Sequence, residues 1–314
     1  MGYKNDQYKR VVDLIENSDV FYGDIGNGFF RKEHHPFVLN ARTKNLYTPI
    51  RYKAIEYFAD NNISWWGGYW PTNHTLSSQI ACINHLFPFR HDREAVLSLA
   101  KKVNSDIVDV LIIESDRHHA GYIQFEAVSQ SDHLNEMDGL SPSRGSHCTS
   151  VDALILGKLA NGRNQLLVIE WKYTESYGNE NKGNGVKGAT RKQRYTNLIN
   201  ESTELLTDFC DIYYHEPFYQ LMRQTLWAEQ MIKHKNDELI KADDFLHIHV
   251  IPPENYDLLR KIYRCSNEEM EKTWRSCLAN TAKYIIISPS DLLSPIDNEL
   301  YGELLSYLRT RYWK

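Results

Sequence analysis

Long apolar runs and paired cysteines are both missing from this 314-residue sequence, and each absence narrows what the chain is. No stretch approaches the roughly 18 apolar residues of a transmembrane helix, so we expect no membrane span. The first ten residues, MGYKNDQYKR, lack the apolar run of a signal peptide, and we expect a cytoplasmic protein. The five cysteines form no CxxC pair and are odd in number, which favours reduced thiols.

An excess of positive charge is missing as well. The chain carries 36 lysine and arginine residues against 41 aspartate and glutamate residues, so it has no overall basic footprint for nucleic acid. A local basic cleft in an acidic protein still binds phosphate, so this balance counts only mildly against DNA. There is no internal repeat, and the length allows one large domain or two.

What the sequence does contain is an apolar hairpin. Residues 151–156 and 166–171 are almost wholly apolar, which predicts two strands in the middle of a covered sheet. Asn161 and Gly162, between them, are the strongest short-range signal for a hairpin turn. Strands before and after helices predict an α/β core with helices on both faces. We expect helices near residues 4–17, 76–86, 93–103, 191–209, 217–233, 254–262, 267–277 and 299–312, one more starting with Thr48 as N-cap, and strands at 107–113, 122–128, 245–251 and 284–287.

Three charges interrupt the apolar hairpin: Asp152, Glu170 and Lys172. Glu170 and Lys172 are two residues apart on one strand, so their side chains share a face. Buried charges are costly unless they are paired or coordinate a metal. One interpretation is a structural salt bridge between Glu170 and Lys172. The other is that Asp152 and Glu170 form an oxygen site for Mg²⁺, beside a lysine that stabilises phosphate charge or positions the attacking water.

The metal interpretation sets a condition on the turn. A two-residue turn at residues 161–162 would place Asp152 opposite Trp171, on the face away from Glu170, because a one-residue change of register reverses every side chain. The site therefore requires a three- or five-residue loop or a bulge, and a left-handed glycine in a three-residue loop would supply it. We predict that Asp152 is closest in register to Glu170 or Lys172, with its carboxylate near that of Glu170.

The pattern of Asp152, seventeen residues, then Glu170-x-Lys172 resembles the PD-(D/E)XK nuclease superfamily. RGSHCTSVDA ahead of IEWKYTE, together with SSQIACINHLFP and QLMRQ, is similar to a family of restriction endonucleases within it. Val151 stands where the superfamily often has proline. The resemblance implies a restriction-endonuclease-like central mixed sheet flanked by helices. We expect a helical and irregular N-terminal extension, residues 1–74, packed on a nuclease core of residues 75–314.

The resemblance also implies an activity. The protein would be a Mg²⁺-dependent restriction-type endonuclease that hydrolyses DNA phosphodiester bonds, with Mn²⁺ as a substitute metal. Asp152 and Glu170 would hold the metal, and Lys172 would complete the catalytic set. DNA is the expected partner, and a homodimer and a cognate methyltransferase are further expectations. The alternatives are a repair, recombination or mobile-element nuclease, and a catalytically silent DNA-binding or regulatory protein on the same fold.

Other residues extend the candidate site. Glu126 is either an additional metal ligand or an edge charge facing solvent. Arg144, in a loop that leads into the hairpin, either reaches a DNA phosphate or forms a structural ion pair. Arg223 belongs to a polar helical stripe with Gln220 and Gln224, which either faces the site or satisfies loop carbonyls.

Residues 176–192 are rich in glycine, asparagine and cations, and we expect a mobile loop that opens a helix near residue 191. It either closes over a DNA backbone or is a solvated flexible loop. Its candidate DNA contacts are Lys182, Lys187, Arg191 and Lys192.

The aromatic run WWGGYW, residues 65–70, is either a stacking platform for bases or the packing of a loop onto the core. His247 and His249 share one face of an expected strand, but no third ligand stands at a zinc-site spacing. Thirteen histidines include no HExxH run, so the sequence offers no support for a zinc enzyme.

Overall fold

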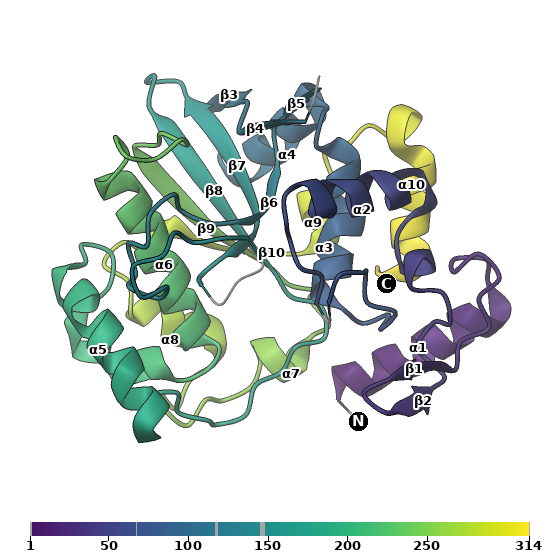
Figure 1. Ribbon diagram of the computed structural model, residues 1–314, viewed down its shortest axis with the longest axis horizontal. Coiled ribbons are helices and arrows are strands. Elements are labelled where there is room, and N and C mark those ends of the chain that lie inside the picture. Colours follow the sequence, from purple (N-terminus) through teal and green to yellow (C-terminus); the bar gives the residue numbers. More distant parts are fainter. Residues whose placement is uncertain (1, 67, 117–118, 145–147, 314) are drawn as a thin grey trace.

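In the computed structural model, which describes residues 2–66, 68–116, 119–144 and 148–313, a six-stranded mixed sheet forms the centre of the molecule (Figure 1). Its order is β10–β9–β8–β7–β3, and β6 also pairs with β7. Strands β8, β9 and β10 are parallel, and β7 is antiparallel to β8, β3 and β6. The strands are β3 (Ile107–Leu111), β6 (Gln124–Ala127), β7 (Val151–Leu159), β8 (Asn164–Trp171), β9 (Asp244–Val250) and β10 (Tyr284–Ile287). The expected central mixed sheet is confirmed.

Helices cover both faces of this sheet (Figure 1). One apolar core includes residues of α3, α4, α9 and α10, and a second includes residues of α5, α6, α7 and α8. None of the described helices combines the length and apolar composition needed to cross a bilayer. The helices are α1 (Tyr3–Asn17), α2 (Arg51–Asp60), α3 (Ser78–Leu86), α4 (Arg93–Val103), α5 (Gly185–Glu201), α6 (Phe218–Lys233), α7 (Tyr256–Leu259), α8 (Met270–Ser276), α9 (Pro289–Leu292) and α10 (Asn298–Arg311).

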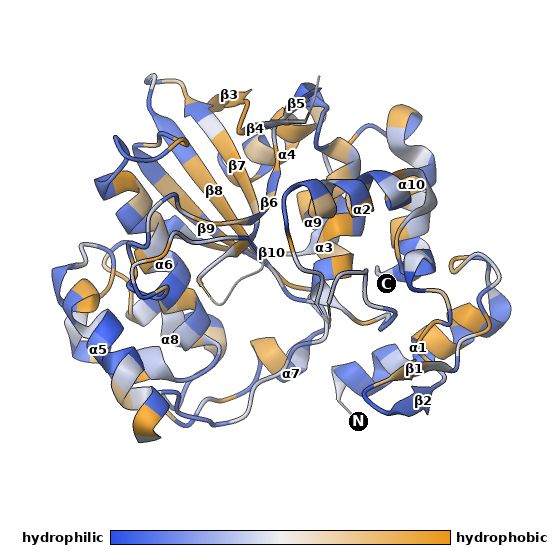
Figure 2. Cartoon of the chain, viewed as in Figure 1, coloured by the Kyte–Doolittle hydropathy of each residue, from blue (hydrophilic) through white to orange (hydrophobic). Residues whose placement is uncertain are grey.

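Both faces of the hairpin strands are covered by apolar cores, which explains their apolar composition. In Figure 2, β7 and β8 are largely orange. In β8, Leu167 and Ile169 belong to the core on the α3 side, whereas Leu166 and Val168 belong to the core on the α6 side. This alternation is the two-residue period of a strand. It assigns every later residue of β8 to a face.

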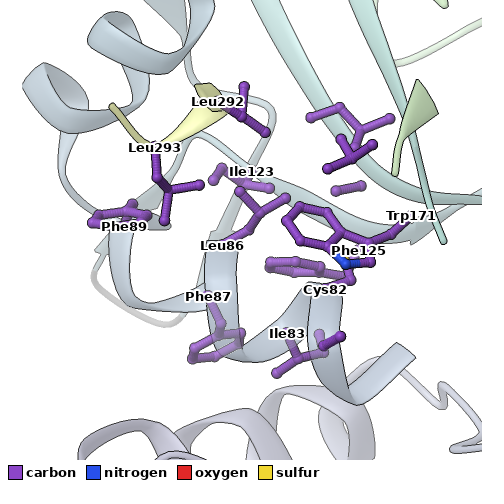
Figure 3. Packing of buried hydrophobic residues seen from close by; sticks show 14 of the residues in the cluster. Cys82, Ile83, Leu86, Phe87, Phe89, Ile123, Phe125, Trp171, Leu292 and Leu293 are labelled. Atoms are coloured by element: carbon purple, nitrogen blue, oxygen red, sulfur yellow. The ribbon is translucent and has the colours of Figure 1, made fainter. Parts of the chain in front are cut away.

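Trp171 fixes the orientation at the end of β8. Its indole lies on the α3 side, close to Phe125 of β6 and Cys82 of α3 (Figure 3). Because neighbours on a strand point to opposite faces, Glu170 points to the α6 side.

One edge of β7 is shared by two strands. Its last residues pair with β3 and its first residues pair with β6. Between β3 and β6 the chain leaves the sheet in a small hairpin, β4 (Glu114–Asp116) and β5 (His119–Gly121). As a result, β6 returns beside the start of β7, which is where Asp152 lies.

The N-terminal segment packs on the same core as the sheet. Buried residues of α1 and α2, including Val11 and Phe58, share one apolar cluster with α3, α4 and α10. The extension, for which helices and irregular structure were expected, contains a hairpin of β1 (Gly28–Phe30) and β2 (Glu33–His35). Its two turn residues, Arg31 and Lys32, have positive φ. Long side chains rarely adopt this conformation, so the residue types at these positions did not predict a turn. The proposed division at residue 74 stays a prediction.

Helices α2 and α5 begin at residues other than the predicted ones. Thr48–Ile50 is a 3₁₀ turn, and α2 starts only at Arg51. Helix α5 starts at Gly185 and ends at Glu201, so half of the expected mobile loop is helical. Gly188 serves close packing there, because a Cβ on it would overlap the backbone of Gly183.

Candidate active site

The loop of the central hairpin has three residues. Lys158 pairs with Asn164, and the amide of Leu159 donates to the carbonyl of Arg163 (2.8 Å). Gly162, inside the loop, has φ +85°, a left-handed conformation that glycine adopts without strain. Along the strands Ala153 pairs with Ile169, and one step further the same register puts Asp152 opposite Glu170. The predicted register is confirmed.

A third acid continues this row. On the other side of β7, Phe125 pairs with Ala153 and Ala127 pairs with Val151, so Glu126 stands opposite Asp152. Glu126, Asp152 and Glu170 therefore occupy one row across three adjacent strands, at a point where neighbouring strands lie about 4.7–4.9 Å apart. Sequence spacing suggested two of these acids and left the third open between a ligand and an edge charge.

Glu126 departs from strand geometry. Its φ is +50°, which is costly for a non-glycine residue and is typically found where the surroundings impose it. Phe125 and Ala127, which flank it, belong to opposite cores of the sheet. The Glu126 carboxylate accepts hydrogen bonds from Gln79 Nε2 (2.7 Å) and Ser150 Oγ (3.3 Å). Burial raises the pKa of Glu126.

Asp152 lies between the other two acids. Its Oδ2 accepts a hydrogen bond from the backbone amide of Trp171 (2.7 Å). Burial, followed by the Glu170 and Glu126 carboxylates, raises the pKa of Asp152 well above its usual range. Carboxylates crowded in this way favour a bound cation, which would remove the repulsion that holds the proton.

Glu170 and Lys172 are both buried on the α6 side of the sheet. Lys172 Nζ donates to Glu170 Oε1 (2.7 Å) and to Gln220 Oε1 (2.6 Å). Burial alone would lower the pKa of Lys172, but Glu170 outweighs it and leaves that pKa well above the ordinary value. The Glu170–Lys172 salt bridge of the structural interpretation is therefore present, and its Glu170 is also a member of the acidic row.

Helix α6 supplies the amides that hold Glu170. Gln220 Nε2 donates to Glu170 Oε1 (2.7 Å), and Gln224 Nε2 donates to Glu170 Oε2. Gln224 Oε1 in turn accepts from His247 Nε2 (3.1 Å), which fixes the amide's orientation. Gln220 and Gln224 of the α6 stripe therefore face the site, and Gln224 Nε2 also donates to the loop carbonyl of Ser150 (3.3 Å), so both interpretations hold for Gln224.

The acidic row opens into a cleft of about 1040 Å³. Asp152 and Glu126 line it, together with Gln79, Ser150 and Glu175, whereas Glu170 and Lys172 do not. Glu175 accepts hydrogen bonds from Ser78 Oγ and from the backbone amide of Tyr173 (2.7 Å). Sequence reasoning did not single out Glu175, although it stands in the run IEWKYTE.

The donor set fits a hard cation. Mg²⁺ binds one or two carboxylates and keeps several waters. Within the part of the chain that the structure describes, no group of three or more histidine, cysteine, aspartate or glutamate residues is placed to hold a metal ion, so Glu126, Asp152 and Glu170 do not form a ready three-ligand site. His247 and His249 are buried in β9, and His249 Nδ1 bonds to the hydroxyl of Tyr284 (2.8 Å).

Arginines proposed as DNA contacts have internal partners. Arg144 donates to the carbonyl of Phe125 (2.9 Å) and to Asn61 (2.9 Å), and lies 3.3 Å from Glu114. This arrangement favours the structural ion pair that was the alternative for Arg144. Arg223 donates to a buried carboxylate, Glu136, over a distance of 3.0 Å. Gly145 to His147, in the same sequence run, lie outside the described residues.

The cations of the basic segment lie at the start of α5 and just before it. Lys182 pairs with Glu180 (2.8 Å), and Arg191 donates to the carbonyl of Lys182 (2.8 Å). Lys187 and Lys192 are exposed. Their contact with DNA stays a prediction.

The aromatic run divides between the two roles foreseen for it. Trp65 is buried and stacks on Phe58, with ring centroids 3.8 Å apart. Trp66, Tyr69 and Trp70 are 44 %, 95 % and 55 % exposed. Gly67 lies outside the described residues. One residue thus packs the loop onto the core, and three remain at the surface.

Comparison with known protein families matches residues 7–313 to the family described as Restriction Endonuclease associating with ARP. No curated protein and no solved structure matches the chain. The matched range begins within α1 and ends beyond α10, so it includes the sheet, the acidic row and the cleft. The protein therefore belongs to this restriction endonuclease family.

Proposed function

We propose that the protein is a Mg²⁺-dependent endonuclease that hydrolyses phosphodiester bonds in DNA, and that it is a member of the PD-(D/E)XK superfamily. The observation that supports this most strongly is the row formed by Glu126, Asp152 and Glu170 across three strands, with Lys172 bonded to its last member. The family assignment supports a restriction-type nuclease with a DNA substrate.

Asp152 and Glu170 would hold Mg²⁺, with Glu126 as a further oxygen donor, and Mn²⁺ satisfies the same ligands. When bound, the ion supplies charge neutralisation at the phosphate and lowers the pKa of a water molecule. A carboxylate has about four lone-pair sites, so Glu170 can ligate the ion and still accept the amides of Gln220 and Gln224.

The chain's own groups do the positioning. Lys172 carries a full positive charge and is held by Glu170 and Gln220, so its ammonium group can stabilise charge that develops on phosphate oxygens. Gln224 holds the Glu170 carboxylate in one orientation, as outer partners of metal ligands do. Lys182, Lys187, Arg191 and Lys192 are proposed contacts to the DNA backbone, and a homodimer and a methyltransferase partner stay predictions.

Cleavage of supercoiled plasmid DNA tests the proposal. We expect nicked and linear products with Mg²⁺ or Mn²⁺, and none with excess EDTA. Glu170→Gln removes a ligand charge with little change of shape and should slow cutting by at least about 100-fold. Glu303→Gln, at an exposed glutamate of α10 outside the row, is the matched control and should cut at the wild-type rate. Cutting that survives EDTA, or equal rates for both variants, would contradict the proposal.

One observation favours a second candidate, a catalytically silent DNA-binding protein on the same fold. Both carboxylate oxygens of Glu170 are already bonded, to Lys172, Gln220 and Gln224, and Glu170 does not line the cleft. Calorimetric titration with Mn²⁺ separates the candidates. Binding that is lost in Asp152→Asn supports the nuclease, whereas DNA binding without metal binding supports the silent protein.

A further inference from the structure

One part of the cleft that contains Asp152 and Glu126 is lined by aromatic and cationic side chains. Phe30 and Trp66 lie with ring centroids 5.5 Å apart, and the guanidinium of Arg31 is 5.4 Å from the first ring and 5.7 Å from the second. Lys4 lines the same cleft. Each of these residues comes from the N-terminal segment, outside the central sheet.

Trp66 is the member of the aromatic run that belongs to this wall. Trp65 also borders the cleft, but its ring is buried against Phe58. Tyr69 and Trp70 are more exposed than Trp66 and do not line the cleft. The indole of Trp66 therefore combines an accessible face with a place inside the cavity.

One glutamine ties this wall to the acidic row. The backbone amide of Trp66 donates to Gln79 Oε1 (2.7 Å), and Gln79 Nε2 donates to Glu126 Oε1 (2.7 Å). Gln79 Nε2 also donates to the carbonyl of Ser64 (3.4 Å), and all three partners line the same cleft. The spacing between the aromatic wall and the carboxylates is thus set by a single, fully bonded amide.

We propose that the Phe30–Arg31–Trp66 wall binds an unpaired base of the DNA strand whose phosphate lies at the acidic row. This inference rests on the proposed nuclease function. In an intact duplex each base is stacked on both faces, so only an unpaired or extruded base can offer a face to an indole. Arg31 and Lys4 would meet the phosphates beside that base, and the substrate is DNA with an unpaired nucleotide near the cut.

Fluorescence anisotropy tests the proposal with three labelled probes in Ca²⁺ buffer: a single-stranded 16-mer, its perfect duplex, and that duplex with one bulged nucleotide. We expect the single strand, the bulged duplex or both to bind about tenfold more tightly than the perfect duplex. If only the bulged duplex binds more tightly, the wall binds an extruded base. If the single strand also binds more tightly, the wall binds a base of a single-stranded segment.

Three variants locate the effect. Trp66→Ala should remove most of the preference, and Trp66→Phe, which retains an aromatic face, should keep it. Trp70→Ala is the matched control, a similarly exposed tryptophan outside the cleft, and should bind like the wild type. Thermal unfolding by circular dichroism confirms that each variant is folded. Equal affinity of the wild type for all three probes, or equal losses in Trp66→Ala and Trp70→Ala, would overturn the proposal.

The binding assay does not depend on cleavage, so its result tests the base-binding wall independently of the nuclease proposal. Mg²⁺-dependent plasmid cutting with unchanged binding by Trp66→Ala overturns the base-binding wall and leaves the nuclease in place. Loss of base preference in Trp66→Ala, together with no cutting under any metal, supports the wall and overturns the nuclease.

Discussion

At the scale of single residues, the buried Glu170–Lys172 pair is both a structural ion pair and the centre of the candidate chemistry. Removing one partner of a buried pair leaves an uncompensated charge and costs about 3–5 kcal/mol, whereas replacing both partners is often nearly neutral. Stability and activity should therefore respond differently to single and double substitutions, and the difference separates the two roles.

We predict that Lys172→Met lowers the free energy of unfolding by about 3 kcal/mol and abolishes plasmid cutting. The double variant Glu170→Gln/Lys172→Met should recover most of that stability, because no unpaired charge remains, and should still not cut. Urea unfolding and the plasmid assay measure the two effects. If the double variant cuts DNA, the pair is structural only.

Glu126 shows why strain matters at this scale. A positive φ at a non-glycine residue costs on the order of 1–3 kcal/mol and is maintained here by Gln79 and Ser150 on its carboxylate. The same conformation brings a third acid to the row. Strand propensity could not have predicted this conformation of Glu126. In a regular strand, Phe125 and Ala127 would point to the same face, because they are two residues apart.

At the scale of elements, helix α6 is the support of the site. Its Gln224 receives a hydrogen bond from His247 of β9 and donates one to Glu170 of β8, so the helix and two strands are joined through one amide. Burial along α6 places this amide away from water, where an unsatisfied partner is costly.

Gln224→Leu should reduce the rate of plasmid cutting by about 10- to 100-fold, since Glu170 loses the partner that orients its carboxylate. Gln193→Leu, at an exposed glutamine of α5, is the control and should cut normally. Cutting rates at saturating Mg²⁺ check this. An unaffected Gln224→Leu would show that α6 only packs against the sheet.

At the scale of the whole molecule, buried neutral histidines link stability to pH. Burial lowers the pKa of His74 to about 4, and that of His85 and of His247 to about 3. In His85, burial outweighs the hydrogen bond from Nδ1 to the carbonyl of Ala81 (2.6 Å), which by itself raises the pKa, and Nε2 accepts from the indole of Trp313 (3.0 Å). A proton on Nε2 would break the second bond.

These pKa values lie below that of an unfolded histidine, about 6.5, so the unfolded state binds protons first as the pH falls. The stabilising contribution is complete above pH 6.5 and is lost progressively toward pH 4. We predict that the free energy of unfolding falls between pH 6.5 and 5, by up to about 1.4 kcal/mol per pH unit for each histidine. Urea titrations in this range measure it. His85→Gln, which keeps a neutral side chain, should show a shallower slope, and an identical slope would exclude His85.

Much of the fold followed from local patterns in the sequence. Period and length predicted α4 and β10 to the residue, and the unbroken apolar runs predicted the central hairpin. The β1–β2 hairpin and the start of α5 were mispredicted. In the first, long side chains take positive φ in the turn, and in the second, glycines pack closely where flexibility was expected.

The sequence by itself determined that Asp152, Glu170 and Lys172 interrupt an apolar hairpin, and that only an odd loop or a bulge would bring the two carboxylates together. Covalent spacing and the two-residue period of strands were sufficient for that. Only the tertiary structure decided that Glu126 joins the row, that Gln224 holds Glu170, and that Trp66 lines the same cleft as Asp152 and Glu126. Those pairings join strands, helices and loops far apart in the chain, and packing of the whole molecule alone brings such segments together.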